Sequence, residues 1–256
     1  MMVMDMTTKG RTGVEVSSKE AGAHGDHWHA ILGYHKVVQL EPHIHDFISE
    51  LNVGARVNDL VTHAAQYENL DVVGVQQGEY LATLFPVVKS QRTIPVEIKE
   101  VIEWDHVDGV EAQIVGVGKD TYSLNFFATD YTENKELYKQ GGTLDIAMAG
   151  LAYVIDSAAS MPENVADNFC AYLPNSDMPT GMDYDFIGEV LSVSESTLKN
   201  EELVHLEIKL INDQAAPDLF NLPIVTNKNN LRCEGIQVGD RLSGCFWLQG
   251  AVASAD

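Results

Sequence analysis

The chain contains the stretch Tyr122-Ser-Leu-Asn-Phe-Phe-Ala-Thr-Asp130, and about 97 residues later it contains Leu219-Phe-Asn-Leu-Pro-Ile-Val-Thr-Asn227. In both places a polar segment with a glycine follows, Gly141-Gly142 in the first copy and Val238-Gly239-Asp240 in the second. A long apolar run then closes each copy, at residues 144–155 and 242–252, with a slip of one residue after the glycine. The pattern predicts a duplicated unit built from extended chain.

Short runs rich in valine, isoleucine and aromatic residues surround these stretches and predict further strands. Turn signals such as Asp108-Gly109 separate them. The clearest alternation is in residues 204–210, where every second side chain is apolar, as in a strand with one buried face. The expected strands cover residues 95–104, 110–117, 122–128 and 144–155 in the first copy, and 186–193, 204–210 and 242–252 in the second.

Short strands at roughly ten-residue spacing resemble small closed barrels of the oligonucleotide/oligosaccharide-binding (OB-like) or SH3-like kind. The resemblance implies an architecture and no catalytic residue. We therefore expect a mainly β protein with an α+β N-terminal part and two tandem small β-barrel-like modules, at residues 96–156 and 184–256. Residues 157–183 are expected to be a linker with a short helix, capped by Ser160 and started by Pro162. A single longer sandwich is the alternative.

The N-terminal 95 residues lack the predominantly β pattern of the rest of the chain. Residues 1–26 are expected to be a flexible leader, and residues 27–95 an α+β segment. Apolar spacing between Pro42 and Asn69 is closer to helix than to strand and is interrupted at Gly54, which predicts one helix from Pro42 or a broken pair. Residues 70–85 predict a hairpin that turns at Gln77-Gly78.

Charge limits the classes of partner. The net charge of −22 comes from 38 acidic and 16 basic residues, and such a field repels nucleic acid and anionic membranes. No apolar run of about 18 residues exists, so no membrane span is expected. The three cysteines have no CxxC spacing, which indicates neither a disulfide framework nor a zinc knot. Together with the lack of a secretory apolar segment, this predicts a cytoplasmic protein.

Six of the nine histidines fall between positions 24 and 45, and two pairs have His-x-His spacing. On a strand, residues i and i+2 share a face, so such pairs can bind one divalent metal together with a carboxylate. The metal candidates are His27, His29, His43, His45 and Asp46. The second pair resembles the His-x-His at the start of metal-dependent hydrolases, but the rest of that pattern is missing. The other interpretation makes these histidines surface or half-buried residues without a ligand, and a protein without a cofactor.

Five aromatic residues are candidates for stacking on a ligand at a barrel face: Phe127, Tyr131, Tyr153, Phe246 and Trp247. Bases and sugars bind such barrels by stacking, but few basic residues accompany these rings, so packing in a core is the competing interpretation. The chain also lacks the Gly-x-Ser-x-Gly elbow and the phosphate-binding Gly-x-x-x-x-Gly-Lys-Ser/Thr loop.

These observations favour a non-enzymatic cytoplasmic binding or scaffold protein. A protein partner, or a second copy of the chain, suits the acidic surface better than a polyanion does. The alternatives are a metal-dependent, hydrolase-like enzyme that uses the N-terminal histidines and, by analogy of fold alone, a protein that binds single-stranded nucleic acid. Whether the chain is an enzyme is left open.

Overall fold

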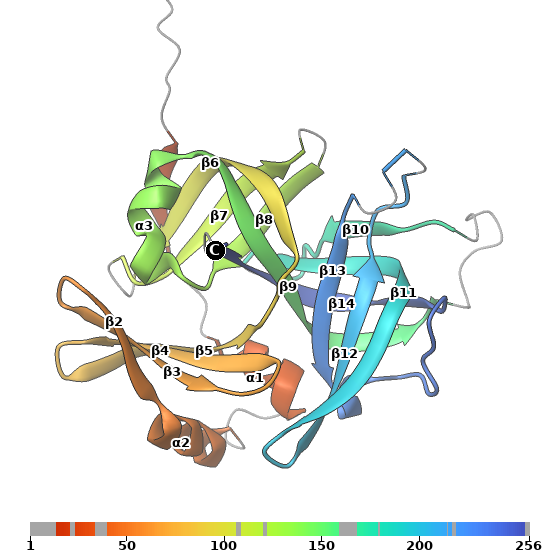
Figure 1. Ribbon diagram of the computed structural model, residues 1–256, viewed down its shortest axis with the longest axis horizontal. Helices are drawn as coiled ribbons and strands as arrows, with labels where there is room; N and C mark the ends of the chain where they lie inside the picture. Colours follow the sequence, from red (N-terminus) through yellow and green to blue (C-terminus); the bar gives the residue numbers. More distant parts are fainter. Residues whose placement is uncertain are drawn as a thin grey trace, which may run out of the picture.

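A computed structural model describes residues 14–20, 24–33, 40–105, 109–119, 122–158, 168–178, 180–213, 215–216 and 219–253. Strands account for 59% of these residues and helices for 15%, which confirms the prediction of a mainly β protein. The strands form a ten-stranded mixed sheet and a separate four-stranded antiparallel sheet (Figure 1). Among the described residues, no helix is long and apolar enough to cross a membrane.

The ten-stranded sheet contains all the strands expected in the two copies. Its members are β1 (Glu15–Lys19), β6 (Thr93–Trp104), β7 (Ala112–Gly118), β8 (Tyr122–Ala128), β9 (Gly142–Ser157), β10 (Ala171–Pro174), β11 (Asp183–Leu198), β12 (Glu201–Lys209), β13 (Asn221–Asn227) and β14 (Arg241–Val252). Part of the expected leader is therefore a strand, because β1 pairs in parallel with β6. The expected linker helix lies outside the described residues, apart from its last positions.

The pairings within this sheet close into two rings. The first ring runs β6, β7, β8, β14, β9 and back to β6, and the second runs β11, β12, β13, β9, β14 and back to β11. Both rings use β9 and β14, which pair with each other antiparallel and join the two halves of the molecule (Figure 1). The division of the chain at residues 157–183 stays a prediction, since strands from both sides of it complete each ring.

Buried side chains fill both rings. The core includes Ile114, Phe126 and Ile146 in the first ring and Ile208 and Ile224 in the second, all with no exposed surface. Gly150 of β9 lies where the rings meet, and a Cβ atom there would be 3.1 Å from the Phe246 ring. Interiors are packed as densely as organic crystals, so a side chain at this crossing would have to displace the Phe246 ring by a few tenths of an ångström.

The N-terminal part forms the smaller sheet and two helices. Helix α2 (Glu41–Glu50) begins around Pro42 as predicted, and the expected hairpin turns at Gly78, whose φ of 61° suits glycine. The predicted second helix is wrong, because the residues around Gly54 form an edge strand. Cross-strand pairing overrides the local spacing here, since short apolar runs suit helix and strand alike. The small sheet consists of β2 (Asn52–Val57), β3 (Leu60–Gln66), β4 (Leu70–Gln77) and β5 (Tyr80–Val88).

Two of the helices, one N-terminal and one in the first copy, hold these parts in place. Helix α1 (Gly25–Leu32) buries Trp28 and Ile31 and contacts β5, β9 and β13, so it lies between the small sheet and the rings. Helix α3 (Tyr131–Gln140) occupies the segment that the sequence indicated only as a polar connection. Buried Tyr131 and Tyr138 anchor it, and the Tyr138 hydroxyl donates to Asp130 at 2.7 Å.

Candidate functional site

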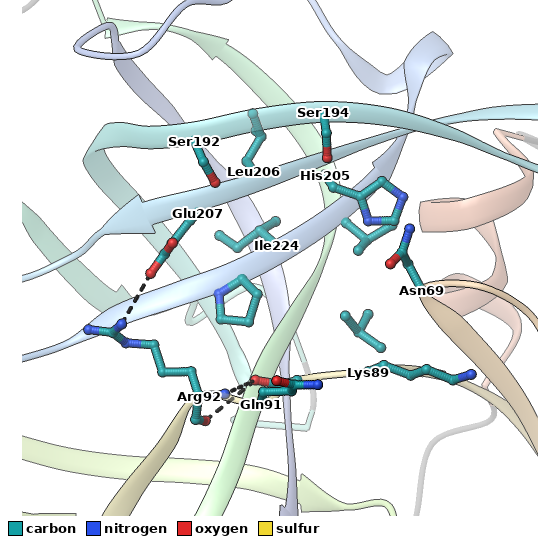
Figure 2. A pocket seen from close by; sticks show the side chains of 14 residues that line it. Asn69, Lys89, Gln91, Arg92, Ser192, Ser194, His205, Leu206, Glu207 and Ile224 are labelled. Carbon is teal, nitrogen blue, oxygen red and sulfur yellow. Dashed lines mark hydrogen bonds and ion pairs between the residues drawn. The ribbon is translucent and has the colours of Figure 1, made fainter.

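An open groove of about 440 Å³ lies on the outside of the second ring (Figure 2). One wall is the outer surface of β11, β12 and β13, and the other is the segment of residues 88–92 between β5 and β6. The groove therefore separates a face of the ring from a chain segment that belongs to the other half of the molecule.

Strand alternation places the polar side chains of the ring wall. In β12, Leu206 and Ile208 are buried inside the ring, so His205 and Glu207 project outwards. Ser192 and Ser194 of the neighbouring β11 are exposed and extend over the same groove (Figure 2). The sequence already predicted the alternation in residues 204–210. Its polar positions, His205 and Glu207, could have indicated this wall of the groove.

The opposite wall carries two basic residues that already have acidic partners. The Arg92 guanidinium lies 3.2 Å from the Glu207 carboxylate across one end of the groove, and the Lys89 ammonium lies 3.0 Å from Asp71. Both pairs are partly exposed, and such pairs contribute about 0–1 kcal/mol to stability. They make this wall locally balanced in charge on a strongly acidic molecule.

His205 lies near the other end of the groove, beside Asn69 (Figure 2). Its Nε2 atom is 2.6 Å from the Ser196 hydroxyl. Burial lowers the pKa of His205 below its ordinary value, and the carboxylate of Glu68 partly opposes the shift. The imidazole is therefore neutral at pH 7 and offers a hydrogen bond without a charge.

A second cavity of about 460 Å³ lies on the opposite face of β11. Its lining combines four apolar side chains, Val193, Val204, Leu231 and Ile236, with the charged side chains of Glu195, Lys228 and Glu234. The Lys228 ammonium lies 3.6 Å from Glu195 and 3.3 Å from Glu202. Residues 192–195 of β11 thus contribute alternately to the groove and to this second cavity.

The structure places the five predicted aromatic residues away from both cavities. Phe127, Phe246 and Trp247 have no exposed surface, and Tyr131 is 1% exposed. Tyr153 is partly buried, and its hydroxyl donates to Asp183 at 2.8 Å. Four of these rings have almost no surface on which a ligand could stack in this conformation, and Tyr153 keeps only part of its surface.

The predicted metal residues lie on helices and not on strands. His27 and His29 belong to α1, while His43, His45 and Asp46 belong to α2. Residues i and i+2 of a helix point in different directions, so His-x-His does not present two imidazoles to one ion there. Within the described part of the chain, no three histidine, cysteine, aspartate or glutamate side chains are grouped as a metal site would require.

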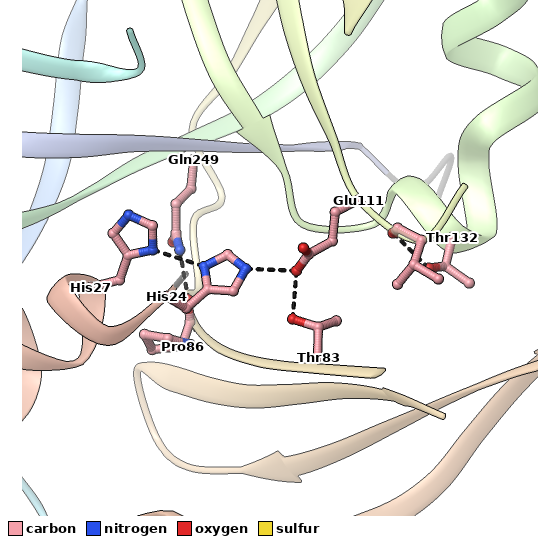
Figure 3. A network of polar contacts seen from close by, with 8 residues as sticks. His24, His27, Thr83, Pro86, Glu111, Thr132 and Gln249 are labelled. Atoms are coloured by element: carbon pink, nitrogen blue, oxygen red, sulfur yellow. Dashed lines mark hydrogen bonds and ion pairs between the residues drawn. The ribbon is translucent and has the colours of Figure 1, made fainter. Parts of the chain in front are cut away.

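Two N-terminal histidines belong instead to a buried polar network (Figure 3). The Nδ1 atoms of His24 and His27 are 2.8 Å apart, and His24 Nε2 is 2.6 Å from Glu111 Oε1. The Thr83 hydroxyl donates to the same carboxylate oxygen at 2.5 Å. The network joins α1, β5 and the segment before β7, so it fixes the small sheet against the first ring.

Aromatic rings enclose this network and affect the protonation of His27. The imidazole of His27 stacks on Trp247 with ring centroids 3.6 Å apart. Burial, with a smaller contribution from His24, holds the pKa of His27 well below its ordinary value, so the ring is neutral. Beside it, the Gln249 amide donates to the Pro86 carbonyl at 2.6 Å and accepts from the Val88 amide at 3.1 Å. These bonds tie the end of β5, and with it one groove wall, to β14.

Comparison of the chain with protein-family models, curated proteins and solved structures finds no match. The function must therefore be argued from the groove, the second cavity and the strand arrangement.

Proposed function

We propose that the chain is a non-enzymatic binding protein that holds a segment of a protein partner in the groove of the second ring. The observation that carries the proposal is the position of the groove across β12 and β13, the second and third strands of that ring. Barrels of the OB-like kind bind oligonucleotides and oligosaccharides on the face of these two strands, so the position of the groove favours a binding face.

The strand order supports an OB-like interpretation of both rings. Three consecutive antiparallel strands come first in each copy, β6 to β8 and β11 to β13. A helical segment follows, α3 in one copy and the short 3₁₀ turn Lys228–Asn230 in the other. A long strand then returns to the first strand, and the other copy supplies the fifth. The result is two five-stranded barrels that exchange their last strands.

The register of the strands supports the duplication. The first strand of each ring has an irregularity at the corresponding point, between Ile98 and Glu100 in β6 and between Val190 and Ser192 in β11. Gln113 opposes Phe127 in the first ring, as His205 opposes Val225 in the second. Bulges that recur at one point of a duplicated unit are structural features and not accidents of pairing.

The chemistry of the groove favours a protein segment. Serine hydroxyls, the Gln91 amide and the neutral His205 supply hydrogen bonds of the kind that a peptide backbone uses, and Pro223 adds an apolar surface. None of the described residues that line the groove is phenylalanine, tyrosine or tryptophan, and His205 is its one ring that could stack on a base or sugar. The net charge of −22 further disfavours a polyanion.

A groove-filling variant tests the proposal. Random octapeptides displayed on phage would be selected on the intact chain and then measured against Ser194→Trp, which fills the groove, and Thr143→Trp, an exposed position on β9. We expect selected peptides to bind the parent chain and Thr143→Trp alike and to lose at least tenfold in affinity, about 1.4 kcal/mol, on Ser194→Trp. Equal binding to all three proteins would overturn the proposal, as would tighter binding of an oligothymidylate at low salt.

A further inference from the structure

We propose that the partner segment binds as an added parallel β-strand along residues 192–196 of β11, with its side chains alternating between the groove and the second cavity. This inference rests on the proposed function and names the class of partner. The segment is extended, carries an apolar residue at the position that faces the second cavity, and ends in a lysine at the groove.

The edge of β11 is available for such an addition. On one side β12 pairs with β11 throughout residues 189–198, whereas on the other side β14 pairs only with residues 183–189. Along the second edge of residues 192–196, no strand is paired among the residues that the structure describes. Ser192, Val193, Ser194 and Glu195 are all exposed. Unpaired strand edges are templates for pairing with another chain.

The first ring already contains the same addition. There β9 pairs with residues 93–98 of β6, and β1 continues that edge in parallel, from Glu15 opposite Glu100 to Lys19 opposite Trp104. Val101 of β6 and Val193 of β11 occupy corresponding positions, opposite Ile114 and Leu206. Val101 is fully buried beside β1, whereas Val193 is 36% exposed.

The side chain at the end of β1 fills the space that corresponds to the groove. Lys19 contacts the Gln113 side chain, which holds the position of His205, and donates to the Thr180 carbonyl at 2.9 Å. The Asn125 amide also donates to the Gly181 carbonyl at 2.8 Å and closes this face. In the second ring the corresponding residue is Pro223, which opposes Glu207 as Asn125 opposes Val115. Its side chain has no donor, so it cannot bind the crossing segment as Asn125 does.

The two cavities define which side chains the added strand would present. Positions opposite Ser192 and Ser194 face the groove, the position opposite Ser196 lies next to His205 at its end, and the position opposite Val193 faces the second cavity. A lysine at the last position would lie near His205, on which the Glu68 carboxylate acts electrostatically. In strand addition the backbone supplies affinity and the pockets for alternate side chains supply specificity.

The peptide acetyl-Val-Glu-Val-Ser-Ser-Lys-amide, which carries the sequence of residues 14–19, is the probe for this mode. Fluorescence anisotropy should give saturable binding that a scrambled peptide does not reproduce. N-methylation of single peptide amides should weaken binding at least tenfold at alternate positions and little at the others, because only every second amide faces β11. Hydrogen exchange should slow at residues 192–197 on addition of the peptide.

Each alternative result has a separate meaning. If phage-selected peptides bind in the groove but neither they nor the probe show an alternating N-methyl pattern, strand addition is overturned and the proposed function stands. If no peptide distinguishes Ser194→Trp from Thr143→Trp, the proposed function itself fails. Should sedimentation reveal a concentration-dependent dimer that Ser194→Trp abolishes, the occupant is a second copy of the chain, and the inference of a different partner is wrong.

Discussion

The two rings share two strands and the same strand order, yet one has its outer face closed and the other has it open. In the first ring, β1 covers the free edge of β6, and Lys19 and Asn125 bind the segment that crosses the face. In the second ring, the corresponding edge of β11 is exposed and the face carries a groove. The same surface is therefore closed by internal packing in one copy and left open in the other.

The largest expected effect on stability concerns the buried polar network that joins the small sheet to the first ring. Replacing Glu111 by alanine removes the carboxylate that His24 and Thr83 share and leaves both polar groups buried. Leaving a buried polar group without its partner costs about 1–3 kcal/mol, and here two groups lose theirs. Urea unfolding of Glu111→Ala should reveal a loss of this size.

Glu207→Ala is the matched control at the open face, because its pair with Arg92 is about one-third exposed. Removing that pair should change the free energy of unfolding by about 0–1 kcal/mol. If the two variants lose similar amounts of unfolding free energy, the buried network stabilises the protein no more than a surface ion pair does.

The next effect concerns the closed face of the first ring. Lys19→Met keeps most of the aliphatic stem but removes the charged group that binds the Thr180 carbonyl and Gln113. Hydrogen bonds to charged groups contribute about 1.5–3 kcal/mol, so unfolding of this variant should require correspondingly less free energy. Exchange of the β1 amides should also accelerate. If neither the free energy of unfolding nor the exchange of the β1 amides changes, Lys19 does not help to close this face.

A pH-dependent effect follows from His27. Its pKa is lowered in the folded protein by burial, so the unfolded chain binds more protons below the ordinary histidine value of about 6.5. The contribution of neutral His27 to the free energy of unfolding is complete above that value. It is lost as the pH falls towards the folded pKa, by about 1.4 kcal/mol per pH unit. The difference in unfolding free energy between the parent and His27→Phe, measured from pH 7.5 to 5, should carry this slope. If this difference does not change with pH, His27 is protonated to the same extent in the folded and the unfolded protein, and burial does not lower its pKa.

The sequence could predict the strands of both copies because alternation and β-branched residues depend on nearest neighbours. It could not predict that β9 and β14 would each serve both rings, since pairing partners far apart in the chain leave no local pattern. Helix α3 was missed because its buried side is limited to residues such as Tyr131 and Tyr138 in a polar segment. The stacking aromatics were chosen by residue type, and burial depends on three-dimensional packing that composition does not contain. The His-x-His pairs were interpreted on strand geometry, whereas the chain folds them on helices.

An effect on stability as small as that of Glu207→Ala should come from Arg92→Ala, which removes the same ion pair from the other side. Arg92→Ala removes the pair that spans one end of the groove, and a pair with both side chains about one-third exposed contributes about 0–1 kcal/mol. Binding should respond differently, because the loss leaves the Glu207 carboxylate without that cation and available to a basic group of the partner. We expect tighter binding of a lysine-containing peptide and no such gain for its norleucine analogue, measured by anisotropy at low and high salt. If both peptides gain equally, removal of the arginine acts by widening the groove, and the charge of Glu207 has no part in recognition.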